Sequence, residues 1–523
     1  MRSLRLQRVK AFQDTGDIQL APLTIFVGQN SCGKSSFIRF PVVISQSFSS
    51  GNSAICLHSN APGTIDYGNF QDVLYQHQGD SFSFSFTEQY QDLRSTPIIR
   101  LPEYNNTCIV RCSITFAKRN SRKASEIIIH DYIVEYDNEL AFRFSYNKRK
   151  YDVVVKKTIQ DGLITETNLE FSFSTKYPIA LDGSFFTYRD EDILKGIVNT
   201  YFYDNEEIKK SARKIIQKEG YKFRYIGSLN DAGFSDSYNL TQEQYHKIMK
   251  AFYAASQAVH VQQALNYHLF LNTNNMHYIG PFRNNPQRIY RRDESVRRKV
   301  GHSGEYASDM LINDYIDHGE LTKNVSKWFE EAFGYSISVH ELKADKTGTG
   351  YYQISLKEAK IKKERNLMDV GYGISQVLPI VIQLAEATTK IQKYSRNNNE
   401  FFVIEQPELH LHPAAQAKLA SLFVNAINNE SVEYRRILVE THSEHLIRSI
   451  QVMIADPDCF LTNEMVRIYS VEKNEDNCST ITEMKMTEKG QFIDKWPSGF
   501  FDKSFELSRA LLKAINKRNA DGE

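Results

Sequence analysis

Residues 28–35 read Gly-Gln-Asn-Ser-Cys-Gly-Lys-Ser and follow directly after the apolar run Leu-Thr-Ile-Phe-Val at 23–27. Two glycines at this spacing permit a turn in which successive backbone N–H groups converge on an anion. The apolar residues within 35–45 predict a buried helix that begins where this turn ends. A strand, a glycine-rich turn and a helix in this order predict a phosphate-binding loop in an α/β fold.

This loop predicts how a nucleotide is held. The ammonium group of Lys34 would meet the β- and γ-phosphates of ATP, and the Ser35 hydroxyl would ligate Mg²⁺. The alternative is an accidental glycine turn, which the preceding strand and the following helix disfavour. The residues expected to contact the nucleotide are Gly28, Asn30, Ser31, Cys32, Gly33, Lys34, Ser35 and Ser36.

A second buried-type strand, much later in the chain, carries acidic residues at its end. The run Phe-Phe-Val-Ile at 401–404 is followed by Glu405-Gln-Pro-Glu408, and α/β sheets place ligand chemistry at the carboxyl ends of their strands. Glu405 would hold Mg²⁺, directly or through water, and Glu408 would polarise the water that attacks the γ-phosphate. The alternative is an acidic turn that only ends a strand.

Two further segments carry polar residues next to predicted elements. The stretch Asp-Val-Gly-Tyr-Gly-Ile-Ser-Gln at 369–376 opens an apolar helix over 377–387, which predicts a second anion-binding helix N-terminus. After the predicted strand 437–439, Glu440-Thr-His442-Ser places an imidazole at a strand end. A lone histidine is more often structural than functional, so this segment gains its weight from the other motifs.

The order of these four motifs resembles a known family. The P-loop, Gly-Tyr-Gly-Ile-Ser-Gln at 371–376, Phe-Phe-Val-Ile-Glu-Gln-Pro-Glu-Leu-His-Leu-His-Pro at 401–413 and Thr-His-Ser at 441–443 look like motifs of ABC-type ATPases of the SMC and OLD-like group. The resemblance is particularly to bacterial AAA-family proteins of phage-defence operons. It covers the two expected halves of an ATPase head, residues 1–75 and 275–450.

The resemblance implies further roles for individual residues. Gly373 and Ser375 would form a signature loop that acts on the ATP held by the other protomer, and His442 would be the switch histidine. Residues 410–413 would communicate between the two sites. Gln71 would be the Q-loop residue that senses Mg²⁺. The expected assembly is therefore a homodimer or higher oligomer with composite ATP sites.

Nucleases of the OLD-like type add a Toprim domain, which needs a glutamate and a downstream Asp-x-Asp to hold metal ions. The candidate Asp456-Pro-Asp458 follows a predicted helix over 445–454 instead of a strand, and too few residues follow it to build that domain. No nuclease is predicted in this chain. The chain also departs from the resemblance at Glu405, where many relatives have aspartate.

The pattern of predicted strands and helices along the chain is that of an α/β protein with a large insertion. Alternating strands are predicted between residues 80 and 180, and helical periodicity over 190–218 and 241–271 predicts a helical arm. The four expected parts are the N-terminal half of an ABC-type P-loop ATPase head (1–75), an inserted antiparallel β-region with the arm (76–274), the C-terminal half of the head (275–450) and a small C-terminal domain (451–523).

Composition restricts the environment of the protein. The 523 residues include 64 Lys plus Arg and 63 Asp plus Glu, so no overall field attracts nucleic acid or an anionic membrane. The six cysteines form no CxxC pair and are expected to be reduced. With no secretory signal and no membrane-spanning apolar run, a cytoplasmic protein without membrane contact is expected. The basic run Arg283–Lys299 is either a solvated face or a contact for nucleic-acid phosphates.

These features favour a Mg²⁺-dependent ATPase whose two protomers enclose ATP. The resemblance implies a regulatory or sensor subunit of an anti-phage complex that controls a partner effector, such as an HNH nuclease. One alternative is a DNA-bridging or repair clamp of the SMC and RecF type. Another is a nucleotide-gated scaffold with negligible turnover.

Overall fold

The computed structural model consists of two compact units, each described here by itself. The antiparallel unit comprises Met1–Gln19, Val43–Asn60 and Thr64–Asn274, and the P-loop unit comprises Leu20–Val42, Ala61–Gly63 and Asn275–Glu523. The residues that the structure describes are 1–49, 54–58, 65–94, 101–120, 125–147, 150–160, 162–174, 196–197, 199–200, 210, 241–295, 297–317, 319–344, 347–358, 363–389, 400–427, 435–494, 496, 507 and 509–513.

The P-loop unit is built on a sheet with the strand order β11-β16-β17-β4-β18-β19. The first five strands in this order run parallel, and β19 pairs antiparallel with β18. The predicted apolar strands are confirmed at its centre, since strands buried on both faces read as continuous apolar runs. The strands are β4 (Leu23–Gly28), β11 (Met276–Ile279), β16 (Glu400–Glu405), β17 (Arg435–Glu440), β18 (Val466–Lys473) and β19 (Ser479–Glu483).

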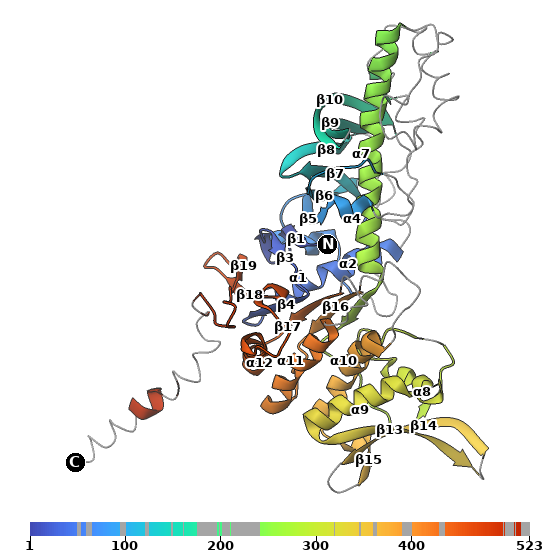
Figure 1. The fold of residues 1–523 in the computed structure, drawn as a ribbon, viewed down its shortest axis with the longest axis vertical. Coiled ribbons are helices and arrows are strands. Elements are labelled where there is room, and N and C mark those ends of the chain that lie inside the picture. The colour runs from blue at the N-terminus through green and yellow to red at the C-terminus, as the bar shows by residue number, and fades with distance from the viewer. Residues whose placement is uncertain are drawn as a thin grey trace. The chain divides into compact units, whose positions relative to one another are not determined.

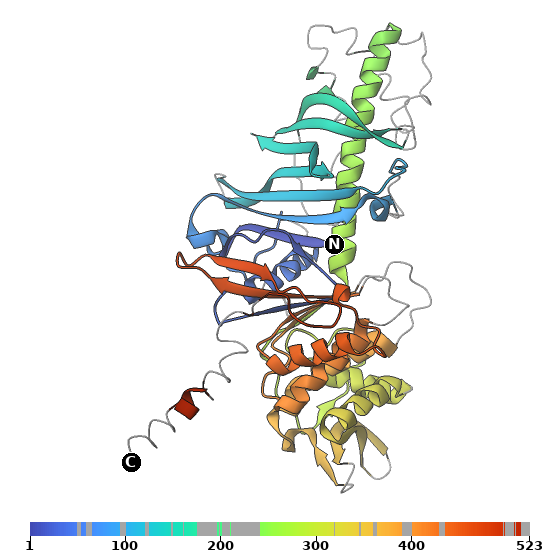
Figure 2. The same cartoon turned by 60° about the vertical axis from the view of Figure 1, so that its left-hand side comes forward.

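Helices cover both faces of this sheet (Figure 1 and Figure 2). On one face Phe37, in the helix after the P-loop, packs against Phe26 of β4 with ring centroids 5.0 Å apart. Ile25 points to the opposite face, where it belongs to one buried cluster with the remaining helices. The helices are α1 (Lys34–Ile38), α8 (Ala307–Asp317), α9 (Glu320–Phe333), α10 (Tyr372–Thr389), α11 (Pro413–Ile427) and α12 (Glu444–Ala455), and α2 (Phe40–Ser49) runs across the division between the units.

The C-terminal segment corrects one sequence-based expectation. Residues 451–523 were expected to form a small separate domain, but β18 and β19 belong to the P-loop sheet itself. β18 pairs in parallel with β4 from Val466↔Leu23 to Val471↔Gly28. Pairing with β18 satisfies the second edge of β4, and Tyr469 stacks on Phe26 with ring centroids 5.5 Å apart. The strand that carries the P-loop is therefore enclosed on both sides.

A smaller sheet completes the P-loop unit. The hairpin expected at 336–356 is confirmed as β13 (Tyr335–Ala344) and β14 (Thr347–Glu358), with β12 (Tyr290–Arg291) and β15 (Glu364–Asn366) also on β14. Ile337 and Val339 of β13 share the buried cluster with Trp328 of α9. A 3₁₀ turn, η5 (Leu367–Asp369), leads from β15 to α10. This sheet therefore lies directly before the predicted signature loop in the chain.

The antiparallel unit holds a long sheet ordered β10-β9-β8-β7-β6-β5-β1-β2, with β3 also paired to β1. The predicted β-rich alternation between residues 80 and 180 is confirmed. Residues 3–19, expected in the N-terminal half of the head, pair into this sheet, with Leu4 opposite Phe86. The strands are β1 (Ser3–Val9), β2 (Phe12–Asp14), β3 (Ile18–Gln19), β5 (Ser81–Gln89), β6 (Ile109–Asn120), β7 (Ser125–Tyr136), β8 (Glu139–Asn147), β9 (Lys150–Gln160) and β10 (Leu163–Ser174).

One face of this sheet is apolar and packs against the helix α7 (Gln242–Asn274) (Figure 1). The predicted helix over 241–271 is confirmed, and polar groups anchor it to the sheet. The Gln257 side chain accepts from Ile159 N at 2.6 Å and donates to Ile159 O at 2.7 Å. The Tyr132 hydroxyl donates to Asn266 Oδ1 at 3.0 Å. The expected helix over 190–218 lies almost entirely outside the described residues.

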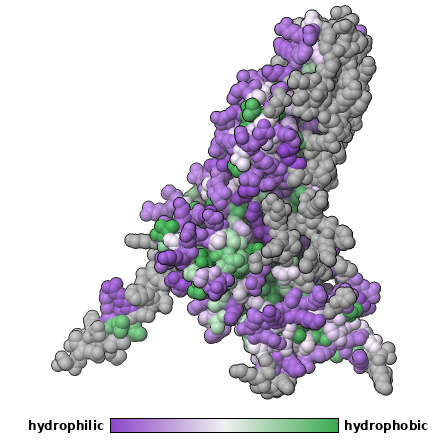
Figure 3. Space-filling model, in the orientation of Figure 1, coloured by the Kyte–Doolittle hydropathy of each residue, from purple (hydrophilic) through white to green (hydrophobic). Residues whose placement is uncertain are grey.

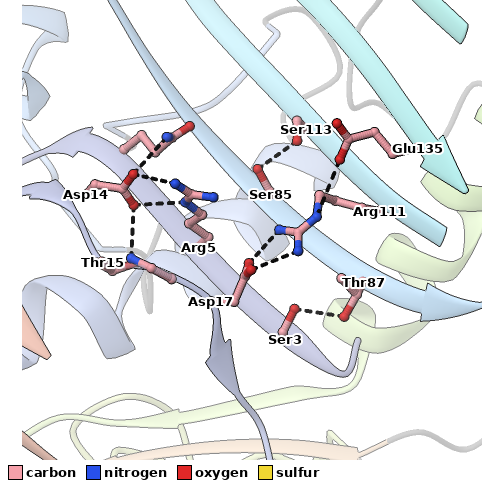
Figure 4. Close-up of polar contacts among 12 residues, drawn as sticks. Ser3, Arg5, Asp14, Thr15, Asp17, Ser85, Thr87, Arg111, Ser113 and Glu135 are labelled. Atoms are coloured by element: carbon pink, nitrogen blue, oxygen red, sulfur yellow. Dashed lines mark hydrogen bonds and ion pairs between the residues drawn. The ribbon is translucent and has the colours of Figure 1, made fainter. Parts of the chain in front are cut away.

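The other face of the sheet is polar, because side chains alternate between faces along a strand. Arg5 and Asp14 form a paired contact, with Arg5 Nε to Asp14 Oδ1 at 2.8 Å, and Arg111 reaches both Asp17 and Glu135 (Figure 4). Figure 3 shows that the surface of this unit on the side facing the viewer is mainly hydrophilic. The short elements of the unit are α3 (Phe70–Val73), η1 (Tyr75–His77) and α4 (Tyr90–Arg94).

If β18 belongs to the P-loop sheet, Ile468→Ala should destabilise the whole P-loop unit. Ile468 is fully buried, and truncation of a buried isoleucine costs about 2–5 kcal/mol of unfolding free energy. Urea unfolding followed by tryptophan fluorescence reports on this unit, because Trp328 and Trp496 both lie in it. Ile493→Ala is the control, since Ile493 is 64% exposed. An unchanged transition for Ile468→Ala would mean that the C-terminal strands fold apart from the sheet.

Candidate phosphate and nucleotide site

The P-loop has the backbone conformation that its sequence predicts. Gly28 and Gly33 have φ angles of 143° and 102°, and Ser31 between them has a φ of 60°. A Cβ atom at Gly28 would lie 2.2 Å from the carbonyl oxygen of Val471, on the neighbouring strand β18. Glycine is therefore required at position 28 both by its dihedral angle and by the close approach of β18.

The Lys34 side chain is folded back over the loop. Its Nζ donates to the carbonyl oxygens of Gly28 at 3.1 Å and Gln29 at 2.7 Å. The side chain is 3% exposed and its Nζ lies 3.7 Å from Glu440 Oε1. The ammonium group is thus held at the mouth of the loop by neutral carbonyls and one carboxylate. An incoming phosphate would offer it stronger, charge-assisted hydrogen bonds.

The Ser35 hydroxyl, the predicted metal ligand, also meets Glu440. Ser35 Oγ donates to Glu440 Oε2 at 2.6 Å. Burial raises the pKa of Glu440, and the hydrogen bond from Ser35 acts in the opposite direction. Glu440 was not predicted from the sequence as a site residue; it entered only as the residue before the Thr-His pair. Its position at the end of an apolar strand was the signal that could have identified it.

Glu405, the other predicted metal ligand, has a different set of partners. Arg39 donates to both carboxylate oxygens, from Nε and from Nη2, each at 2.6 Å. The Tyr278 hydroxyl donates to Glu405 Oε1 at 2.8 Å. Neither Arg39 nor Tyr278 was identified from the sequence as a site residue. The structure therefore brings Glu405 to the same sheet edge as Ser35 but turns its carboxylate toward an arginine and a tyrosine.

Glu408 and His442 lie together beyond the strand ends. The backbone N–H of His442 donates to Glu408 Oε1 at 2.7 Å, while Glu408 Oε2 is buried without a hydrogen-bond partner. Burial raises the pKa of Glu408. The pKa of His442 is lowered to about 4 by burial and by the nearby Lys34 ammonium, and its Nε2 is also buried without a partner. Both atoms therefore have hydrogen-bonding capacity left for a ligand or a water molecule.

The predicted signature loop packs against the loop that follows Glu408. A Cβ atom at Gly373 would lie 2.2 Å from the carbonyl oxygen of His410, and the rings of Tyr372 and His410 are 5.0 Å apart. Ser375 Oγ donates to Tyr372 O at 2.8 Å, and Ser375 is 5% exposed. The structure thus joins this segment to residues 410–413 within one unit, and it turns the Ser375 hydroxyl onto its own helix.

The proposed Q-loop residue lies in the other unit. Gln71 is in α3, and its side-chain amide donates to the backbone carbonyl of His77. Asn69 caps this short helix, with Asp72 completing a capping box. The described contacts of Gln71 therefore stay within the antiparallel unit.

The basic run Arg283–Lys299 is largely engaged within the P-loop unit. Arg283 is buried, donates to Glu405 O at 2.6 Å and has its pKa lowered to about 10 by burial. Arg288 forms a two-bonded ion pair with Asp369. Arg297 pairs with Asp293 and lies over a tyrosine ring. Arg292 also donates to Asn313 Oδ1 at 3.2 Å, so at least four of the seven Arg and Lys side chains in this run have intramolecular partners, which weakens the expectation of a nucleic-acid contact here.

The residues at this edge fit a nucleotide with its magnesium ion. Lys34 offers a cation at the P-loop, and Ser35 offers a hydroxyl next to a carboxylate. Among the described residues, no group of three or more His, Cys, Asp or Glu side chains could hold a metal ion by itself. Proteins usually bind Mg²⁺ through one or two carboxylates together with substrate phosphates.

The fold and site define a P-loop protein of the α/β class with an inserted antiparallel sheet. A family model described as the AAA ATPase domain matches residues 1–447. The chain therefore belongs to the AAA ATPase domain family, and ATP binding follows from that membership. Comparison with curated proteins finds no match.

Several solved structures of SMC head domains are similar to the chain. One is the head domain with an extended coiled coil from Pyrococcus furiosus, bound to the C-terminal domain of ScpA, with 12% identity, coverage of 98% of this chain and 99% of that chain, and a TM-score of 0.37. Another is the SMC head domain from Thermotoga maritima, with 11% identity, coverage of 93% and 100%, and a TM-score of 0.32.

Within the part of the chain that the structure describes, no helix combines the length and the apolar character needed to cross a bilayer. All six cysteines, Cys32, Cys56, Cys108, Cys112, Cys459 and Cys478, are free thiols.

The lowered pKa of His442 predicts a pH dependence of stability. The pKa of this histidine is 6.5 in the unfolded chain and about 4 in the folded chain. At a pH between these two values, the unfolded chain binds a proton at His442 that the folded chain does not. Stability from this residue therefore falls as the pH falls through that window. Urea unfolding at several pH values between 4 and 6.5 gives the unfolding free energy of wild type and of His442→Gln. This free energy should change less with pH in the variant than in wild type. His445→Gln, which changes an exposed neighbour, should follow wild type, and equal slopes for all three would contradict the prediction.

Proposed function

We propose that this protein binds ATP with Mg²⁺ and hydrolyses it at the P-loop. The observation that carries the proposal is the convergence of Lys34, Ser35, Glu408 and His442 at one edge of the sheet. Family membership supports it as well. The unpartnered Glu408 Oε2 adds a specific argument, because a buried carboxylate oxygen without a donor is costly unless a ligand or water completes it.

Each residue has a role that follows from its position. Lys34 would exchange the Gly28 and Gln29 carbonyls for the β- and γ-phosphate oxygens. Glu408 would accept a hydrogen bond from the attacking water through Oε2 and orient it toward the γ-phosphate. His442, neutral at physiological pH because its pKa is about 4, would donate a hydrogen bond from Nε2–H to a γ-phosphate oxygen. Ser35 together with a carboxylate at the strand ends would hold Mg²⁺, which would supply positive charge to stabilise the phosphates.

We also propose that the active form is a dimer in which Gly373 and Ser375 contact the nucleotide of the partner. Support comes from the surface around the signature segment, where large apolar side chains are exposed. Met368 is 53% exposed, Tyr372 is 50% exposed and Phe282 is 84% exposed. Met368 and Tyr372 lie close in sequence to Gly373 and Ser375, and Met and Tyr side chains are enriched where proteins meet.

The wider role rests on the order of the motifs. We propose that ATP binding and hydrolysis time the association of protomers with an effector in anti-phage defence, such as an HNH nuclease. Co-purification with the products of neighbouring genes tests this role. An effector that associates in the presence of ATP and is released after hydrolysis supports it, and a protein that elutes without any partner in every nucleotide state contradicts it.

Glu408→Gln should separate nucleotide binding from hydrolysis. The amide keeps the size of the side chain but cannot take up a proton, so phosphate release should fall by about 10²–10⁴-fold while ATP affinity is retained. Multiple-turnover phosphate release and equilibrium ATP binding measure the two effects. Normal turnover by this variant would remove Glu408 from the mechanism.

The same variant tests the dimer. Glu408→Gln should accumulate as an ATP-bound dimer in size-exclusion chromatography with light scattering. Adding Tyr372→Arg should keep the protein monomeric with ATP, because Tyr372 is 50% exposed next to Gly373 and a long, charged side chain there obstructs the surface that meets the partner's nucleotide. A Glu408→Gln protein that stays monomeric with ATP would leave each protomer acting alone.

A further inference from the structure

Two carboxylates lie next to each other at the carboxyl edge of the P-loop sheet. Glu405 ends β16 and Glu440 ends β17, and the two residues are direct partners in the parallel register. Both are almost completely buried, at 1% and 3% exposure. Two buried negative charges at this spacing repel one another, and each raises the energy of the other's ionised form. Each carboxylate therefore needs its own compensating group.

The structure divides these compensating groups unequally. Glu405 receives three hydrogen bonds, two from the Arg39 guanidinium and one from the Tyr278 hydroxyl. Both of its oxygens have partners, and a guanidinium with two parallel bonds is among the strongest partners that a carboxylate has in proteins. To reach a metal ion, Glu405 would have to give up at least part of this pairing.

The closest compensating groups of Glu440 belong to the phosphate-binding loop, and Arg39 adds a weaker electrostatic attraction. Its Oε2 accepts from the Ser35 hydroxyl at 2.6 Å, and its Oε1 lies 3.7 Å from Lys34 Nζ. These are the two side chains that a P-loop uses for the metal ion and the phosphates. When Lys34 turns to a phosphate and Ser35 turns to a metal ion, Glu440 loses both partners and faces the position of that ion.

The geometry points to Glu440 as the carboxylate that holds Mg²⁺ together with Ser35, an inference that rests on the proposed ATP binding. Adjacent ligands of an octahedral Mg²⁺ ion, each about 2.1 Å from the metal, lie roughly 3 Å apart. Ser35 Oγ and Glu440 Oε2 are separated by 2.6 Å, so the two oxygens are close enough to serve as ligands of one Mg²⁺ ion. Glu405 remains paired with Arg39 and Tyr278 and positions the strand end.

A titration of nucleotide binding against free Mg²⁺ tests this assignment without using turnover. Binding of a fluorescent ATP analogue is measured in EDTA and at increasing Mg²⁺ for wild type and for Glu440→Gln, Glu405→Gln and Ser35→Ala. The amide substitutions keep the side-chain size, and a thermal melt confirms folding of each variant. Glu444→Gln, four residues further on and partly exposed, is the matched control.

Glu440→Gln should raise, by at least about tenfold, the Mg²⁺ concentration at which the enhancement of analogue binding is half-maximal. In EDTA the same variant should bind the analogue as well as or better than wild type, because a negative charge next to the phosphates is removed. A merely misfolded site would instead weaken binding under both conditions. Glu405→Gln and Glu444→Gln should keep a Mg²⁺ requirement close to that of wild type.

Ser35→Ala, Glu440→Gln and the double variant Ser35→Ala/Glu440→Gln form a double-mutant cycle, which measures whether the two side chains act on Mg²⁺-dependent binding together. If both side chains hold one ion, the double variant should lose little more than either single variant. The inference is overturned if Glu440→Gln keeps the wild-type Mg²⁺ requirement, or if Glu405→Gln alone loses it. Failure of wild type to bind the analogue at any Mg²⁺ concentration would instead overturn the proposed function itself.

Discussion

The parallel hydrogen-bonded register between β16, β17 and β4 is the constraint on which the rest of this site depends. It places Glu405 beside Glu440 and aligns Glu440 with Phe26, two residues before the P-loop begins. Because parallel strands end at the same edge, side chains that are hundreds of positions apart in the chain meet over a few ångströms. A shift of one residue in this register would turn the carboxylates to the opposite face of the sheet.

This register also places two buried carboxylates side by side, and neighbouring groups compensate part of their negative charge. Three buried carboxylates, Glu405, Glu408 and Glu440, lie at or just after the carboxyl ends of β16 and β17, and burying a carboxylate without a partner is costly. Arg39 compensates the first, while Lys34 and Ser35 compensate Glu440. Glu408 keeps one oxygen without a donor. The groups that are least compensated are thus the ones that a nucleotide, a metal ion or a water molecule can reach.

The enclosure of the P-loop strand ties stability to this chemistry. β4 is central because β17 covers one edge and β18 the other, and the Val471 carbonyl reaches to the space that a side chain at Gly28 would fill. The C-terminal strands therefore help to shape the phosphate-binding loop. The sheet of the antiparallel unit is stabilised in a different way on each face. The helix α7 packs on its apolar face, and ion pairs between neighbouring side chains lie on its polar face.

The sequence by itself determined the elements whose signals are local. The glycine spacing at 28–33, the apolar runs of β4, β16 and β17, and the alternation of the antiparallel strands each follow from neighbouring residues, because dihedral freedom and side-chain periodicity are local properties. Only the tertiary structure decided that β18 belongs beside β4, that Arg39 and Tyr278 engage Glu405, and that Glu440 meets Ser35. These outcomes depend on strand order and register, which are set by pairing between distant segments and leave no mark in any short stretch of sequence.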